Sequence, residues 1–220
     1  MPCRNWAYRH DFRICQVFQL DFAEFFILEK IKEFYNNGGI YYALAEVERI
    51  TGEVFSTDEG ASRVVISHKS WDFVLKVNTY EYEEEDVNAR EECNYTSAKE
   101  YEIEDFLLPV EKFYCEGSLE FYIQPKITSI YSRVMQISTE SSSWDIYRNR
   151  ASEKDFISYV GCLDRMPKDF LKICIGYYGA EFMERVCKWA VAQKVNDLHG
   201  SNVGFYRGRP VLFDYAGFFG

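Results

Sequence analysis

Three oxygen-bearing side chains near the end of the sequence have a spacing that could hold a divalent cation beside a base. Asp197 and Asn202 are separated by four residues in "DLHGSN", and Asp214 follows in "FDYAGF". Carboxylate and amide oxygens suit Mg²⁺, together with water and phosphate oxygens. Asn202 and Asp214 meet that need, which leaves Asp197 to accept a proton from a hydroxyl group. The alternative, which the spacing leaves open, is that these residues belong to turns and caps.

A predicted β-hairpin would bring two of these side chains together. We expect strands over 203–206 and 210–213, joined by "RGR", in which Gly208 can adopt a positive φ angle. A hairpin returns the chain to its starting point. Asn202 and Asp214 would therefore lie side by side at its open end.

The order of these residues resembles the catalytic loop of the protein-kinase superfamily. That family carries D-x-x-x-x-N and then the aspartate of D-F-G, to which Asp197, Asn202 and Asp214 correspond. "DLH" is similar to small-molecule kinases such as aminoglycoside phosphotransferases, and to early kinases of some phages. The family places a helix before this loop, and apolar spacing predicts one over 180–195. The resemblance implies ATP and Mg²⁺ as cofactors, with Asn202 and Asp214 as metal ligands and Asp197 as the catalytic base.

The resemblance also implies a lysine on an inner strand and a glutamate that orients it. Lys76 in "DFVLKV" corresponds to the lysine, which would hold the α- and β-phosphates. Glu91, preferred to its neighbour in "NAREE", would pair with it from the following predicted helix. Alternation along a strand would turn Lys76 away from the face formed by Phe73, Leu75 and Val77.

Further contacts with the nucleotide follow from the same resemblance. The implied nucleotide-binding residues are Gly60, Ala61, Ser62, Lys76, Gln124, Lys126 and His199. The first three form a small-residue turn where the family has a glycine-rich loop, although the full G-x-G-x-x-G is absent. The backbone from Gln124 to Lys126 would contact adenine at the hinge. His199 stands where protein kinases usually carry a lysine that touches the γ-phosphate; alternatively, it forms a hydrogen bond with a loop carbonyl.

The sequence departs from the family pattern in two respects. Val195 and Asn196 replace the His-Arg pair before the catalytic aspartate, and "DYAG" replaces D-F-G. The sequence also stops at Gly220, where a protein kinase continues through an activation segment and several helices. We therefore expect a two-lobed, protein-kinase-like fold with a truncated helical C-lobe.

The remaining patterns predict an α+β fold with helices first, then strands, then helices. An N-terminal helical extension would occupy residues 1–52 and a strand-rich, nucleotide-binding N-lobe residues 53–127. Residues 128–220 would form the helical C-lobe with the catalytic loop and metal-binding hairpin. The strand signals are β-branched and aromatic runs at 63–67 and 72–77, with "LEFYIQPKI" as a further strand.

The N-terminal helices have clear local signals. The first is expected over 21–37, where Asp21 and Glu24 can form a capping box and two glycines end the helix. A second, short helix ends at Gly52. These helices could form a homodimer surface or cover the strand-rich lobe, and the sequence leaves both open.

The bulk composition narrows the class of partner. The net charge of -10 argues against nonspecific binding to nucleic acid or anionic membranes. Seven scattered cysteines indicate reduced thiols. No signal peptide or membrane span is apparent, which predicts a cytoplasmic protein, or one of the host cytoplasm if a phage encodes it.

These observations lead to a first hypothesis of an ATP-dependent phosphotransferase, a minimal serine/threonine protein kinase with a protein substrate. One alternative is a pseudokinase that binds a protein partner. Its support is the truncated end, the incomplete glycine loop and an acidic run within 81–92. Another is a small-molecule kinase or an AMP-transferase.

Overall fold

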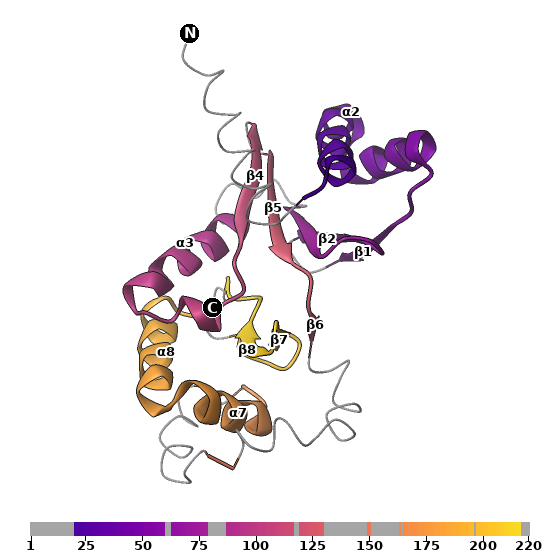
Figure 1. The fold of residues 1–220 in the computed structure, drawn as a ribbon. Coiled ribbons are helices and arrows are strands. Elements are labelled where there is room, and N and C mark those ends of the chain that lie inside the picture. Colours follow the sequence, from indigo (N-terminus) through magenta and orange to yellow (C-terminus); the bar gives the residue numbers. More distant parts are fainter. Residues whose placement is uncertain are drawn as a thin grey trace. The chain divides into compact units, whose positions relative to one another are not determined.

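The computed structural model describes most of the chain in two compact units. The described residues are 20–59, 63–78, 87–116, 119–129, 149–150, 163, 165–195 and 197–216. Unit 1 comprises residues 1–88 and 110–126, and unit 2 comprises 89–109 and 127–220. Within the described residues the fold is α+β, with four α-helices, a five-stranded antiparallel sheet and a three-stranded sheet (Figure 1). The predicted α+β class is confirmed.

The five-stranded sheet of unit 1 has the order β1-β2-β3-β5-β4, with every neighbouring pair antiparallel. Its strands are β1 (Phe55–Glu59), β2 (Arg63–His68), β3 (Phe73–Asn78), β4 (Glu111–Glu116) and β5 (Leu119–Pro125). The predicted strands at 63–67 and 72–77 are confirmed to within one residue at each end. Strand β3 is central, so its side chains are flanked by β2 and β5.

Helix α2 (Phe22–Thr51) begins with the predicted capping box. The Glu24 N–H donates to Asp21 Oδ1 at 2.8 Å, and the Asp21 N–H donates to Glu24 Oε2 at 3.0 Å. Gly52 ends the helix in the left-handed conformation, with φ 75°. The predicted helix start at Asp21 and the predicted helix end at Gly52 are therefore confirmed.

Two adjacent glycines divide α2 into two helical segments. Gly38 has φ -175° and ψ 18°, and Gly39 has φ 78° and ψ -172°, a region that only glycine occupies readily. A Cβ atom on Gly38 would also lie 2.7 Å from Tyr42 Cγ. The predicted break at these glycines is thus present as a sharp kink, and the chain resumes a helix immediately.

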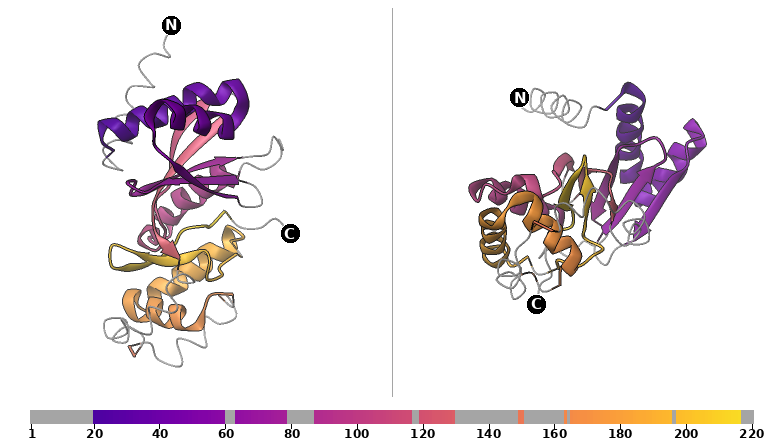
Figure 2. Two further views of the ribbon diagram at one scale, coloured as in Figure 1. Left: turned by 90° about the vertical axis from the view of Figure 1, so that its right-hand side faces the viewer. Right: turned by 60° about the horizontal axis from the view of Figure 1, so that its bottom comes forward.

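Both segments of α2 pack on one face of the sheet (Figure 2). The first contributes Ile27, Leu28 and Ile31, and the second contributes Ile40, Ala43, Leu44 and Val47. The sheet and the β2–β3 connection contribute Val64, Ile66, Trp71, Phe73, Leu75, Val77, Phe113, Phe121 and Ile123. The sequence left open whether the N-terminal helices cover the strand-rich lobe or form a homodimer surface. The inner face of α2 covers the sheet and shares its core.

Unit 2 combines helices with a small sheet. Its elements are α3 (Val87–Glu100, whose first two residues belong to unit 1), η1 (Glu104–Phe106), β6 (Thr128–Ser129), α7 (Lys168–Tyr178), α8 (Ala180–Ala192), β7 (Val203–Tyr206) and β8 (Arg209–Leu212). Helix α8 packs against α3, where the buried Trp189 donates from Nε1 to Ser97 Oγ at 3.0 Å. The Arg185 side chain donates from Nε to the Tyr101 carbonyl at 3.0 Å. These contacts attach the helix before the candidate loop to α3.

The predicted hairpin is present, with a one-residue shift in its second strand. Strands β7 and β8 pair from Val203–Leu212 to Tyr206–Arg209. Arg207 and Gly208 have φ angles of 48° and 76°, the signature of a two-residue type I′ turn. Because the turn uses two residues where the prediction used three, the second strand begins at Arg209. None of the described helices has the length and apolar character that a membrane crossing requires.

Candidate functional site

The end of α8 fixes where the candidate loop begins. Lys194 adopts a left-handed conformation with φ 55°, and the Val195 N–H donates to the Ala190 carbonyl at 2.9 Å. This is the hydrogen bond of a Schellman motif, which terminates a helix. The helix predicted to reach residue 195 therefore ends at Ala192. Asp197 follows this cap, next to the buried side chain of Leu198, so the loop has an anchored start.

The open end of the hairpin places Asn202 beside the chain that leads to Asp214. The Phe213 N–H donates to the Asn202 carbonyl at 2.9 Å, one step beyond the last strand pair. The Asn202 N–H donates to the His199 carbonyl at 2.9 Å and closes the preceding turn. The structure thus brings together the hairpin ends that the sequence predicted would meet.

The Asn202 side chain holds Asp197. It is 6% exposed, and its Nδ2 donates to the Asp197 carbonyl at 2.8 Å and to Asp197 Oδ2 at 3.0 Å. Because Nδ2 makes both bonds, Oδ1 points in another direction and can accept from a ligand or coordinate a cation. One side chain therefore both fixes the candidate base and offers a cation ligand.

His199 is directed at Asp197 as well. Its Nδ1 accepts the Ser201 N–H at 3.2 Å, so the proton of a neutral ring is on Nε2. That atom lies 3.1 Å from Asp197 Oδ1. The expected contact of His199 with a γ-phosphate stays a prediction, and its Nε2–H is directed to a carboxylate in this structure. The alternative expectation was a hydrogen bond from His199 to a loop carbonyl. The ring instead accepts the Ser201 backbone N–H at Nδ1.

Asp214 is half-buried and lies next to a firmly held tyrosine. The Tyr215 hydroxyl donates to the Leu108 carbonyl at 2.6 Å, and Asn94 Nδ2 donates to the Tyr215 carbonyl at 2.7 Å. The Tyr215 ring also meets Trp189 edge-on. Helix α3 and the segment after η1 therefore determine where Asp214 stands.

Arg165 also lies beside Asp197, although no sequence pattern predicts it. Its NH1 atom lies 4.0 Å from Asp197 Oδ1. It precedes Asp197 by 32 residues, and no motif spacing connects the two. Only the tertiary fold of unit 2 brings them together.

In unit 1, Lys76 lies on the central strand and is 3% exposed. It pairs with Val65 on β2 and with Tyr122 on β5. Phe73, Leu75 and Val77 enter the core under α2, so alternation turns Lys76 to the opposite face, as predicted.

Glu91, the predicted partner of Lys76, is fully buried on α3 and belongs to unit 2. Its pairing with Lys76 stays a prediction. The start of α3 is attached to β3 within unit 1, where Asn88 Nδ2 lies 3.5 Å from the Lys76 carbonyl. Asn88 Oδ1 accepts from Arg63 NH1 at 3.1 Å.

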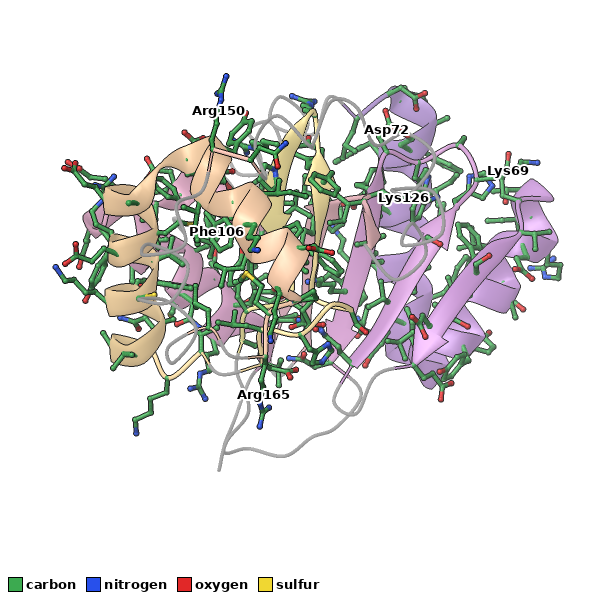
Figure 3. All side chains as sticks on the ribbon, turned by 90° about the horizontal axis from the view of Figure 1, so that it is seen from below. Lys69, Asp72, Phe106, Lys126, Arg150 and Arg165 are labelled. Carbon is green, nitrogen blue, oxygen red and sulfur yellow. The ribbon has the colours of Figure 1, made fainter. Side chains whose placement is uncertain are left out.

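The expected hinge residues are partly engaged within the sheet. Gln124 is 1% exposed and pairs with Val74. The Lys126 N–H donates to the Asp72 carbonyl at 2.6 Å, and its Nζ donates to the His68 carbonyl at 3.0 Å (Figure 3). An adenine contact from the Lys126 backbone would therefore have to use its carbonyl oxygen. Gly60, Ala61 and Ser62 lie outside the described residues.

The donor set at the hairpin fits a hard cation that phosphate helps to bind. Among the described residues, no group of three or more His, Cys, Asp and Glu side chains could hold a metal ion by itself. Asn202 and Asp214 offer one amide and one carboxylate, and Mg²⁺ commonly takes one or two protein ligands plus water and phosphate. Neither a scan against protein-family models nor a search of curated proteins finds a match for this chain.

Proposed function

We propose that the chain is a Mg-ATP-dependent phosphotransferase with a two-lobed, protein-kinase-like fold, acting as a minimal serine/threonine protein kinase. The observation that carries the proposal is the Asn202 side chain. Its Nδ2 binds Asp197 through two hydrogen bonds while the hairpin holds it beside the segment of Asp214. A turn residue needs no such double contact with an aspartate five positions away.

Phosphoryl transfer asks a protein mainly for alignment of the reactants and for neutralisation of phosphate charge. Asp197 would accept the proton of the acceptor hydroxyl, in the orientation that Asn202 fixes. Asn202 Oδ1 and the Asp214 carboxylate would hold Mg²⁺, which would bridge and neutralise the β- and γ-phosphate oxygens. Lys76 would bind the α- and β-phosphates, with Glu91 orienting its ammonium group.

The order of elements along the chain supports the same proposal. In protein kinases the phosphate-binding lysine lies on the third strand and its glutamate on the following helix. Here Lys76 lies on β3, and α3 with the buried Glu91 comes next in the chain. The proposed partners are ATP and a protein substrate, and the proposed compartment is the cytoplasm.

Nucleotide labelling tests the proposal directly. The protein is incubated with Mg²⁺ and ATP labelled at the γ-phosphate, and then with ATP labelled at the α-phosphate, in the presence of protein acceptors. Transfer of the γ-label to serine or threonine is the expected result. Transfer of the α-label would instead identify AMP transfer.

Two variants assign the roles. Asp197→Asn should keep Mg-ATP binding, measured by calorimetry, but lower turnover about 10²- to 10⁴-fold, the usual contribution of a general base. Lys76→Met should weaken ATP binding itself. ATP binding without any transfer would support the pseudokinase alternative, and no ATP binding at all would refute the proposed function.

A further inference from the structure

Arg165 lies beside Asp197 and has no part in the function proposed above. Its NH1 is 4.0 Å from Asp197 Oδ1, and its side chain is 59% exposed, whereas that of Asp197 is 15% exposed. Figure 3 shows the Arg165 side chain projecting from the ribbon of unit 2. The guanidinium is therefore next to the carboxylate and still largely available to solvent.

Stability does not explain this arrangement. An exposed ion pair at this separation contributes little to folding. Other arginines of unit 2 make closer contacts: Arg209 NH1 is 2.6 Å from Asp105 Oδ1, and Arg185 donates to backbone carbonyls. In the described part of the chain, Arg165 has no polar contact other than the distant one to Asp197.

The backbone nevertheless fixes where Arg165 stands. The Met166 N–H donates to the Leu163 carbonyl at 3.0 Å, and both side chains are at most 2% exposed. On the other side, Asp197 is flanked by the buried Val195 and Leu198. Two anchored segments thus hold the largely exposed Arg165 side chain 4.0 Å from the mostly buried carboxylate of Asp197.

We propose that Arg165 binds an anionic oxygen group of a ligand at the Asp197 loop. A guanidinium matches the geometry of phosphate and carboxylate oxygens, which it can bind with two parallel hydrogen bonds. The chain carries a net charge of -10, so an anionic ligand needs local positive charge at this site.

The identity of the ligand rests on the proposed function. Two sources share the same chemistry: the phosphoryl group in transfer, and an anionic group that neighbours the acceptor hydroxyl. Both would lie next to Asp197, because the base must reach the hydroxyl that attacks the phosphorus atom.

Inorganic phosphate is a probe that does not depend on activity. Wild-type protein, Arg165→Gln, Arg165→Lys and Arg207→Gln are titrated with sodium phosphate at constant ionic strength, and the amide signals of residues 198–202 are followed by NMR. Arg207 is the matched control, because it is exposed at the opposite end of the hairpin. Wild type and Arg207→Gln should show saturable shifts with equal affinity.

Loss of the guanidinium should weaken phosphate binding at least about tenfold, the effect of losing one charge-assisted hydrogen bond. Arg165→Lys should give an intermediate affinity, because the charge remains but the planar fork is lost. The melting temperature of each variant should match that of wild type. Equal phosphate affinity in Arg165→Gln and wild type, or no saturable binding by wild type, overturns the proposal.

A transfer assay then separates the two sources. If Arg165 binds the phosphoryl group, Arg165→Gln lowers kcat with every acceptor. If it binds the acceptor, Arg165→Gln raises KM only for acceptors with a carboxylate or phosphate beside the hydroxyl. Failure of wild type to transfer phosphate would refute the proposed function, while the phosphate titration would still decide the role of Arg165.

Discussion

The two units hold their candidate functional groups by different means. In unit 1, Lys76 is positioned by a central strand whose other face is buried under α2. In unit 2, Asp197 and Asn202 lie in a loop and are positioned by side-chain hydrogen bonds to each other and to backbone. A loop can thus fix a site when its polar groups form hydrogen bonds with one another. Substitutions in unit 1 should therefore act through the packing of the sheet and α2. Substitutions at the loop of unit 2 should act through lost hydrogen bonds.

The largest effect should come from Asp214→Ala. Under the proposed function this removes a metal ligand, which should lower phosphotransfer by about 10³-fold or more, the several kcal/mol that metal neutralisation supplies. Asp169→Ala, in the exposed first turn of α7, is the control and should retain activity. Full activity in Asp214→Ala would remove this residue from the site.

Asn202→Ala should affect activity and stability together. It deletes both hydrogen bonds to Asp197 and leaves a carbonyl without its donor, at a cost of about 1–3 kcal/mol in the free energy of unfolding. Turnover should fall by about 10²-fold or more, because the base is no longer oriented and a proposed Mg²⁺ ligand is lost. Urea unfolding measures the loss of stability, and a transfer assay on the same preparation measures turnover. An unchanged turnover would show that the Asn202 side chain has no catalytic role.

Gly39→Ala should destabilise unit 1 without touching any proposed site residue. Its backbone lies in a region that costs other residues about 1–3 kcal/mol. Gly38→Ala should also destabilise, because Tyr42 must move to admit the new methyl group. Unfolding of Gly208→Ala in the hairpin of unit 2 gives the matched comparison, since that glycine has φ 76° and open space around it. A stability equal to wild type in Gly39→Ala would mean that the kink relaxes.

Tyr178→Phe should have the smallest effect, about 1 kcal/mol, confined to unit 2. The Tyr178 hydroxyl lies 2.7 Å from the Pro210 carbonyl and 2.9 Å from the Asp105 carbonyl. Burial, together with nearby Cys174, raises the pKa of Tyr178 well above its usual 10.0. Folding is therefore favoured below pH 10 and loses this contribution as the pH rises further. In Tyr178→Phe the free energy of unfolding, measured with urea, should fall less between pH 9 and 11 than in wild type. An equal fall in both proteins would show that Tyr178 is not the cause.

Local signals in the sequence predicted the elements well, and long-range contacts could not be predicted. The capping box of Asp21 and Glu24, and the hairpin with Gly208, depend on residues close in sequence. The approach of Arg165 to Asp197 depends on the path of the whole C-terminal half. The early end of α8 also escaped prediction, because a lysine with positive φ gives no signal in the sequence.

The chain crosses between the two units three times, after residues 88, 109 and 126. Neither unit is thus a continuous stretch that one cut can release. A fragment that starts at residue 128 would lack α3, and with it the Ser97 partner of Trp189 and the Asn94 partner of Tyr215. Limited proteolysis between β5 and β6 should leave the two pieces associated, because residues of α3 still bind the C-terminal piece. A recombinant form of unit 2 would need a linker that joins residues 89–109 to the C-terminal half.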